Sequence, residues 1–190
     1  MSYNVLVIPE DFRKDQHILK PVVRAILHAA GKTNATLRIC QNPLLGGTGQ
    51  ALNQDRILGI VRQYPMVDLF LLCVDRDGQN ARRSRLDSIE RHVAKHGGKK
   101  TLAENAWQEV EVWVLAGMSD LPNEWTWRDI RTEVDLKERF YLPYVRQRGL
   151  DGFPDQGRKK LGAEAARNYN RIRSRCPEDV KALEARIRKL

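Results

Sequence analysis

The amino-acid sequence predicts an α/β fold: a parallel sheet of about four strands flanked by helices, with a helical C-terminal extension. Over its first hundred residues the chain alternates short apolar runs, rich in β-branched residues, with longer stretches whose apolar residues recur at helical spacing. Hydrophobic residues make up 42% of the 190 residues and charged residues 30%, which is enough to bury the core of one domain.

The elements of this first part follow in a regular order. Three short apolar runs are predicted as strands: residues 4–8 (NVLVI), 35–40 (ATLRIC) and 67–74 (VDLFLLCV). Three stretches are predicted as helices: residues 18–30, 51–64 and 84–96. Strand, helix, strand, helix, strand is the order of a parallel sheet with right-handed crossovers.

Beyond residue 98 the pattern is less regular. Residues 108–115 (QEVEVWVL) alternate like a strand, but the apolar side chains around them also fit one face of a helix, and periodicity leaves both open. Short helices are expected over residues 124–148, and two final helices over 164–174 and 177–190.

We place the boundary between the two parts after residue 118. Residues 1–118 are expected to form the α/β domain, and residues 119–190 a helical, basic extension packed on it. The net charge of +9 and the pI near 9.7 favour a polyanionic partner, nucleic acid before an anionic membrane.

The cysteines and apolar runs indicate a cytoplasmic protein. The three cysteines (Cys40, Cys73 and Cys176) are odd in number and form no CxxC pair, which is typical of a reduced protein without structural zinc. The first residues lack the features of a signal peptide, and no apolar run approaches the length of a membrane span. We therefore expect no membrane partner.

The most informative motif is Asp75-Arg76-Asp77-Gly78, directly after the third predicted strand. Residues i and i+2 at a strand end point the same way, so the two carboxylates can share a hard cation such as Mg²⁺. An ordinary polar turn is the alternative. Glu10 follows the first strand, and in an open parallel sheet these two strand ends can be neighbours. Asp15 either joins them or caps the following helix.

These stretches resemble a known family. A glutamate after strand one and DxD after strand three look like the TOPRIM domain, shared by topoisomerases, bacterial primases and nucleases of the overcoming-lysogenization-defect (OLD) type. The stretches VIPEDFRKD, LLCVDRDG and QEVEVWVLAG look most like small stand-alone bacterial TOPRIM proteins, some of them paired with an ABC-type ATPase in phage defence. The resemblance covers roughly residues 4–118.

The resemblance implies roles for four residues. Glu10 would serve acid–base chemistry or metal binding, and Asp75 and Asp77 would hold Mg²⁺ (or Mn²⁺). A further glutamate follows the fourth strand in nuclease-like members, and Glu111 matches it, with Glu109 close behind. Asp11 stands where the family has glycine, and the next acid, Asp15, is one place late, which leaves their roles open along with that of Glu109.

The expected function is therefore that of a Mg²⁺-dependent nuclease of TOPRIM type, the effector of an ATPase-coupled antiviral system with an ABC/OLD-type ATPase as partner. Basic residues proposed to bind DNA or RNA are Arg76, Arg82, Arg83, Lys100, Lys159 and Lys160. The alternative is a non-catalytic TOPRIM-like module that binds the ATPase or nucleic acid. A transferase that uses DxD for a sugar nucleotide is a third hypothesis, and homo-oligomerisation is left open.

Overall fold

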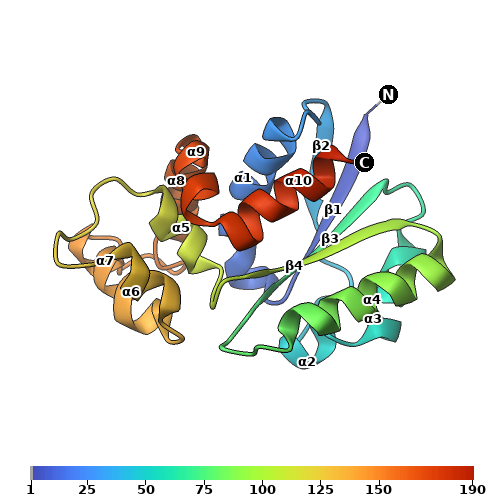
Figure 1. The fold of residues 1–190 in the computed structure, drawn as a ribbon, viewed down its shortest axis with the longest axis horizontal. Helices are drawn as coiled ribbons and strands as arrows, with labels where there is room; N and C mark the ends of the chain where they lie inside the picture. The colour runs from blue at the N-terminus through green and yellow to red at the C-terminus, as the bar shows by residue number, and fades with distance from the viewer. Residues whose placement is uncertain (1) are drawn as a thin grey trace.

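The computed structural model describes residues 2–190 and confirms the α/β fold (Figure 1). Its sheet has four parallel strands in the order β2-β1-β3-β4. Their bounds are β1 (Tyr3–Pro9), β2 (Ala35–Ile39), β3 (Leu69–Asp75) and β4 (Lys100–Ala106). Because β2 lies on one side of β1 and β3 on the other, the chain reverses its winding direction between β1 and β3.

Helices connect the strands and continue after them. The first five are α1 (Phe12–Ala29), α2 (Thr48–Ala51), α3 (Gln54–Gln63), α4 (Arg82–Gly97) and α5 (Glu111–Gly117). The later ones are α6 (Trp127–Thr132), α7 (Leu142–Gln147), α8 (Arg158–Arg167), α9 (Tyr169–Arg175) and α10 (Ala182–Arg188). Two π-helical turns, η1 (Lys137–Tyr141) and η2 (Pro177–Lys181), lead into α7 and α10.

Three stretches differ from the sequence prediction. The helix expected over 164–174 is divided at Asn168 between α8 and α9. The helix expected over 51–64 is divided into α2 and α3, because the Asn53 side chain caps α3 by accepting a hydrogen bond from the Arg56 N–H at 2.9 Å. The fourth strand is residues 100–106 (KTLAENA), which no apolar pattern indicates. Of the two interpretations of residues 108–115, the helix is correct for the part from Glu111 onward, where α5 begins.

Alternate residues of each strand serve two separate cores. Val5 and Val7 belong to the core under α1, α5 and the C-terminal helices. Leu6 and Ile8 belong to the core under α3 and α4. Figure 1 shows α1 and α10 on one side of the sheet and α3 and α4 on the other. The helices beyond residue 118 share the first core, to which α10 contributes Ile187.

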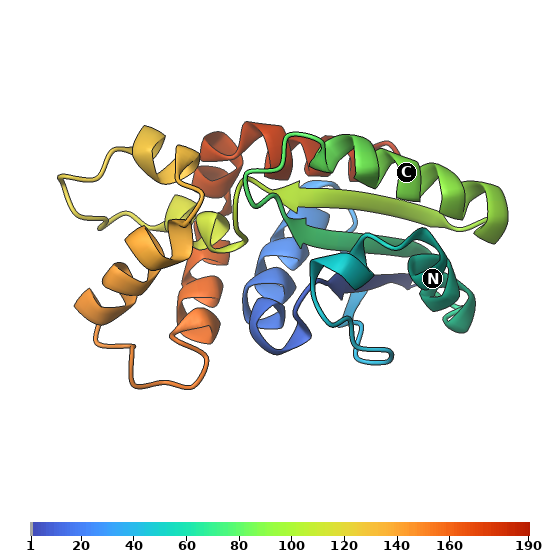
Figure 2. The same cartoon turned by 90° about the horizontal axis from the view of Figure 1, so that it is seen from below.

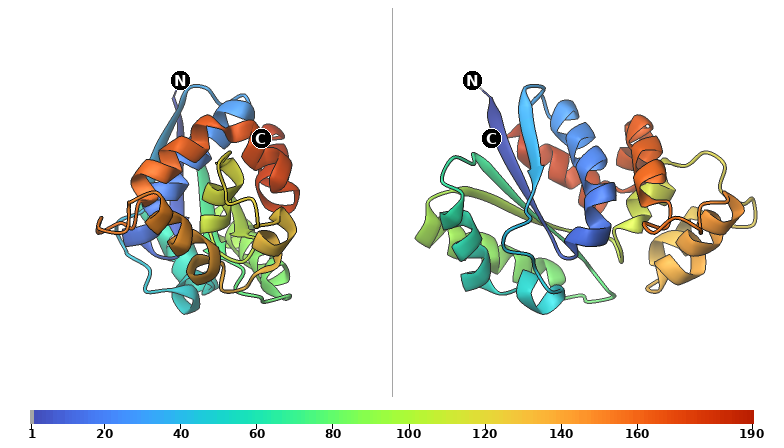
Figure 3. Two further views of the ribbon diagram at one scale, coloured as in Figure 1. Left: turned by 90° about the vertical axis from the view of Figure 1, so that its left-hand side faces the viewer. Right: turned by 180° about the vertical axis from the view of Figure 1, so that it is seen from behind.

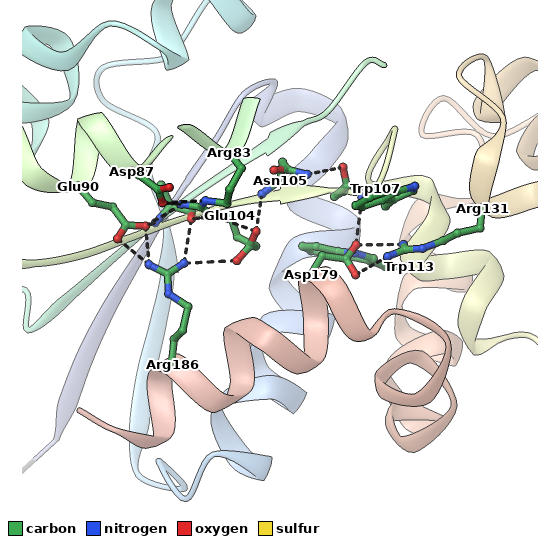
Figure 4. Close-up of polar contacts among 12 residues, drawn as sticks. Arg83, Asp87, Glu90, Glu104, Asn105, Trp107, Trp113, Arg131, Asp179 and Arg186 are labelled. Atoms are coloured by element: carbon green, nitrogen blue, oxygen red, sulfur yellow. Dashed lines mark hydrogen bonds and ion pairs between the residues drawn. The ribbon is translucent and has the colours of Figure 1, made fainter. Parts of the chain in front are cut away.

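The extension also reaches past the end of the sheet. In the right-hand view of Figure 3, α6 and α7 lie beyond the carboxyl ends of the strands, next to α5. The buried carboxylate of Asp179 ties this region to the sheet (Figure 4): it accepts hydrogen bonds from the Trp107 N–H at 3.0 Å and the Trp113 indole N–H at 2.8 Å, and pairs with Arg131.

A second polar network joins α10 to the outer edge of β4 (Figure 4). Arg186 contacts both carboxylate oxygens of Glu90, at 2.5 and 2.6 Å, and donates to the Ala103 carbonyl at 3.1 Å. Arg83 donates to the same carbonyl at 2.8 Å, and the Ala103 N–H donates to Glu90 at 2.7 Å. Both backbone groups of Ala103 are thus occupied by charged side chains.

Close packing of α8 against α1 gives a first testable prediction. A Cβ at Gly162 would lie 2.6 Å from the His17 carbonyl oxygen, so Gly162→Ala is expected to lower the free energy of unfolding by about 1–3 kcal/mol. The matched control is Gly59→Ala in α3, where a Cβ meets nothing within 4 Å, and a gain of up to about 1 kcal/mol is expected. Urea unfolding measures both, and equal effects would show that α8 and α1 are not packed this closely.

Candidate functional site

The carboxyl ends of β1 and β3 meet at the centre of the sheet, where the winding direction reverses. Open α/β sheets bind ligands at this point. Pro9 is the register partner of Cys73, so Glu10 and Asp75 follow on neighbouring strands. The Asp75 N–H donates to Glu10 Oε2 at 3.3 Å. The structure therefore brings together the two strand ends that the sequence selected.

Asp75 lies at the centre of an acidic cluster. Its Oδ1 accepts a hydrogen bond from the Val110 N–H at 2.8 Å. Burial raises the pKa of Asp75 well above its usual range. Four further carboxylates add to this rise, in decreasing order of effect: Glu111, Asp15, Glu10 and Asp77. We call these five residues the acidic cluster. It unites four chain segments: the ends of β1 and β3, and the starts of α1 and α5.

Asp77 sits on a turn with an uncommon backbone conformation. Its φ is +52°, in the left-handed region that few residues with a Cβ adopt. Gln108, itself at φ +75°, holds this turn: its carbonyl accepts the Asp77 N–H at 3.1 Å, and its side-chain Oε1 accepts the Gly78 N–H at 2.9 Å. Sequence reasoning missed Gln108, because nothing in the chain marks it as the partner of the turn. Two residues with positive φ are thus joined by hydrogen bonds that fix the turn after β3.

Arg82 supplies a cation at this turn. Its side chain is only 5% exposed and its Nη2 lies 3.0 Å from Asp77 Oδ2. The pKa of Asp77 is raised, first by burial and then by the charge of Glu10, and Arg82 opposes that rise. Of the basic residues proposed from the sequence, Arg82 is the one the structure places on a carboxylate of the cluster.

Glu10 faces the loop that precedes α2. The Thr48 hydroxyl donates to Glu10 Oε1, and Thr48 is the first residue of α2. Each of the two residues in this contact lines a cavity. One, of about 500 Å³, is lined by Glu10 and the Gly46-Gly47 pair, and the other, of about 410 Å³, by Thr48, Asp77 and Arg82 among others. Solvent and small ligands can therefore reach both carboxylates.

Asp11, and not Asp15, is the N-cap residue of α1, and Asp15 lies in the first turn of that helix. Asp11 caps α1 by accepting the Arg13 N–H at 2.9 Å, and Asp15 Oδ2 accepts the Asp11 N–H at 3.0 Å. Asp15 thus binds the backbone of the N-cap residue and also belongs to the acidic cluster. Burial is the main cause that raises the pKa of Asp15 to about 7, and Glu111 is the strongest of the charges that add to it.

This pKa gives a pH-dependent prediction. Because the folded state holds the Asp15 proton more tightly than the unfolded chain, the stability that Asp15 contributes is present below about pH 4 and lost as the pH rises through about 7. Asp15→Asn keeps an acceptor for the Asp11 N–H and cannot ionise. In metal-free buffer, we expect the free energy of unfolding of the variant, relative to that of the wild type, to increase by about 2 kcal/mol as the pH rises from 5 to 8. Thermal unfolding of both proteins at the two pH values measures this. The prediction would be contradicted if the stability difference between variant and wild type were the same at pH 5 and pH 8.

Glu111 pairs with an arginine from the C-terminal extension. Its side chain is 5% exposed, and its Oε1 lies 2.5 Å from Nη2 of Arg158, whose side chain is 1% exposed. Arg158 also donates to Gln156 Oε1 at 2.7 Å, and its Nε has no partner among the described residues. Sequence reasoning missed Arg158, although it starts the run Arg158-Lys159-Lys160 whose lysines were selected.

The remaining sequence candidates lie apart from the cluster. Glu109 is held by the Lys137 N–H at 2.6 Å, and burial raises its pKa to about 7. Arg76 stacks on the Trp107 ring with its Cζ 4.0 Å from the ring centroid. Arg83 is engaged in the network on the β4 edge, and Lys100 begins β4 at the opposite end of the sheet. Lys159 and Lys160 are exposed on α8.

The chemistry of the cluster suits a hard cation, since every donor is a carboxylate oxygen. Within residues 2–190, no group of three or more His, Cys, Asp or Glu side chains is arranged to hold a metal ion. Glu10, Asp77 and Glu111 each face a protein donor instead: Thr48, Arg82 and Arg158. Glu10 and Asp77 would have to exchange these contacts for the ion.

Comparison of the chain with protein-family models, curated proteins and solved structures gave no match. Across the described part of the chain, no helix has both the length and the apolar character needed to cross a membrane.

Proposed function

We propose that the protein is a metal-dependent nuclease that hydrolyses phosphodiester bonds of DNA or RNA. The observation that supports this most is the acidic cluster at the centre of a parallel sheet, in which burial first, and then four neighbouring carboxylates, raise the pKa of a fifth, Asp75. Such mutual repulsion is costly unless a cation or a proton compensates it. A basic chain of net charge +9 attracts the polyanionic substrate to this acidic centre.

The residues would share the work as follows. Glu10, Asp75 and Asp77 would hold Mg²⁺ or Mn²⁺, which when bound neutralises phosphate charge and lowers the pKa of water. Arg82, which pairs with Asp77, would bind a phosphate oxygen beside the cluster. Glu111, which pairs with Arg158, would complete the acidic cluster around the ion.

The biological role rests on the TOPRIM resemblance. Glu10 after β1 and Asp75 and Asp77 at the end of β3 agree with the order of that family's motifs. On this basis we propose that the nuclease acts with an ABC/OLD-type ATPase in antiviral defence.

One observation favours a second candidate, a non-catalytic module that docks on the ATPase or on nucleic acid. Glu10, Asp77 and Glu111 are all engaged by protein donors. A TOPRIM-like scaffold that no longer binds metal would keep its acidic cluster in this way.

Metal titration separates the two candidates. Isothermal calorimetry with Mg²⁺ and Mn²⁺ is expected to detect binding to the wild type and none to Asp75→Ala/Asp77→Ala. The control is Asp55→Ala, because the Asp55 side chain is 89% exposed on α3, away from the cluster. Cleavage of single- and double-stranded DNA and RNA, assayed with the same metals, is expected to follow the same order.

The outcomes are distinct. Cleavage that survives in Asp75→Ala/Asp77→Ala would refute the metal site. The docking module would be supported instead if the wild type bound neither ion, whether or not nucleic acid is present, and cleaved no substrate.

A further inference from the structure

A cavity of about 590 Å³ lies between the start of α8 and the first half of α1. Its accessible walls are almost wholly apolar and include Leu150, Phe153 and Pro154. Phe153 is 56% exposed, one of few large hydrophobic side chains to be so. An exposed aromatic side chain that lines an apolar cavity offers a stacking surface to a flat apolar ligand.

The rim of this cavity is basic. Lys159 and Lys160 line it from α8 and His17 from α1, and both lysines are exposed. The one acid on the rim, Asp155, already accepts the Lys159 N–H at 2.7 Å and so serves the start of α8. The two ammonium groups therefore remain available to an anionic ligand.

The cavity and the acidic cluster are connected through the first residues of α8. Arg158 lies between the rim residues Gly157 and Lys159, and its guanidinium pairs with Glu111 of the cluster. On the other side, His17 follows Asp15 by two residues on α1, and Figure 2 shows α8 packed beside α1. A strand bound at the cluster could therefore continue into this cavity.

We infer that the cavity binds an unpaired nucleobase, with Lys159 and Lys160 on the flanking phosphates, so that the substrate of the nuclease is single-stranded nucleic acid. Bases of a single strand expose a π-face that stacks on aromatic side chains, whereas bases of a duplex do not. This inference rests on the proposed function, because it takes the occupant of the cluster to be nucleic acid. An apolar side chain of a partner protein would fill the hollow without needing the lysines.

Anisotropy of a labelled oligothymidylate and of a duplex of equal length tests the inference, in buffer with chelator so that no cleavage occurs. Phe153→Ala is expected to weaken single-strand binding about 5-fold or more, and duplex binding less than twofold. Lys159→Ala/Lys160→Ala is expected to weaken single-strand binding and to reduce the slope of log K against log salt by about 1.4.

Matched controls lie elsewhere on the surface. Met66→Ala removes a 77% exposed apolar side chain before β3, and Lys95→Ala/Lys181→Ala removes two exposed lysines from α4 and η2. Neither is expected to change oligonucleotide affinity by more than twofold. Circular dichroism verifies that each variant is folded. Because Phe153 is exposed, we expect Phe153→Ala to leave the fold intact.

The inference is overturned if Phe153→Ala binds oligothymidylate as the wild type does, or if the wild type prefers duplex. A wild type that binds Mg²⁺ but no oligonucleotide would overturn it while leaving the metal site intact. Binding that depends on Phe153 in a protein that takes no metal would support it and refute the nuclease.

Discussion

Replacing Arg158 by methionine is expected to lower the free energy of unfolding by about 3–5 kcal/mol, one of the two largest effects we predict. The Arg158 and Glu111 side chains are 1% and 5% exposed, so the change leaves a carboxylate buried without its partner. That carboxylate then lies among the other acids of the cluster, which increases the cost. Urea unfolding at pH 8 measures the loss.

Two comparisons make this result specific. Arg158→Lys is expected to recover only part of the stability, because an ammonium cannot reach Glu111 and Gln156 with the fixed fork of a guanidinium. Arg148→Met is the matched control: Arg148 pairs with Glu164 and Asp120 in the same extension, but its side chain is 24% exposed, and we expect a loss of about 1 kcal/mol.

A double-mutant cycle isolates the pair. Glu111→Gln combined with Arg158→Met is expected to be more stable than Arg158→Met alone, because the neutral amide no longer needs a cation. If the double variant were less stable than Arg158→Met, Glu111 would not be the group that Arg158 neutralises.

Asp75→Asn is expected to have opposite effects on activity and stability. Loss of the central carboxylate should reduce Mg²⁺-dependent cleavage by about 100-fold or more, since the ion loses one of its three proposed ligands. In metal-free buffer the same variant should be about 1–3 kcal/mol more stable than the wild type at pH 8. The amide still accepts the Val110 N–H, while the charge that four neighbouring acids oppose is gone.

The pH dependence gives this prediction its sign. Because the pKa of Asp75 is raised in the folded state, the charged form destabilises the fold, and the gain in Asp75→Asn should shrink as the pH falls and the wild-type carboxyl takes a proton. Thermal unfolding at pH 5 and pH 8, with cleavage assayed at pH 8, measures both effects. A variant that is less stable than the wild type at pH 8 would show that Asp75 is not crowded by the acids around it.

The sequence predicted the strands that carry an apolar pattern. β1 and β3 read as continuous apolar runs because helices cover both sides of them, whereas β2, an edge strand, alternates buried Leu37 with exposed Thr36 and Arg38. The fourth strand could not be predicted from an apolar pattern, because it buries the polar residues Glu104 and Asn105. Glu104 is paired with arginines from α4 and α10, and it accepts the Asn105 N–H. Only the folded chain brings those partners to the strand.

The candidate site was predictable in part for a related reason. Glu10, Asp75 and Asp77 directly follow apolar strands, and parallel strands finish at one edge, so their convergence follows from local pattern and topology. Arg158 and Gln108 reach the same edge from distant segments. A single sequence carries no signal for such contacts, because nothing in the residues around Arg158 indicates that its partner is 47 positions away.

The charged network on β4 has a consequence for how copies of the chain can associate. β4 is an outer strand, and such a strand ordinarily offers unpaired N–H and C=O groups to which another strand can add. At Ala103 both groups are taken by Glu90, Arg83 and Arg186, and the Asn105 N–H is taken by the Glu104 carboxylate at 3.2 Å. The middle of this edge is therefore blocked against strand addition. Assembly or aggregation by extending the sheet across β4 would first require Arg83, Glu90 and Arg186 to release the backbone of Ala103.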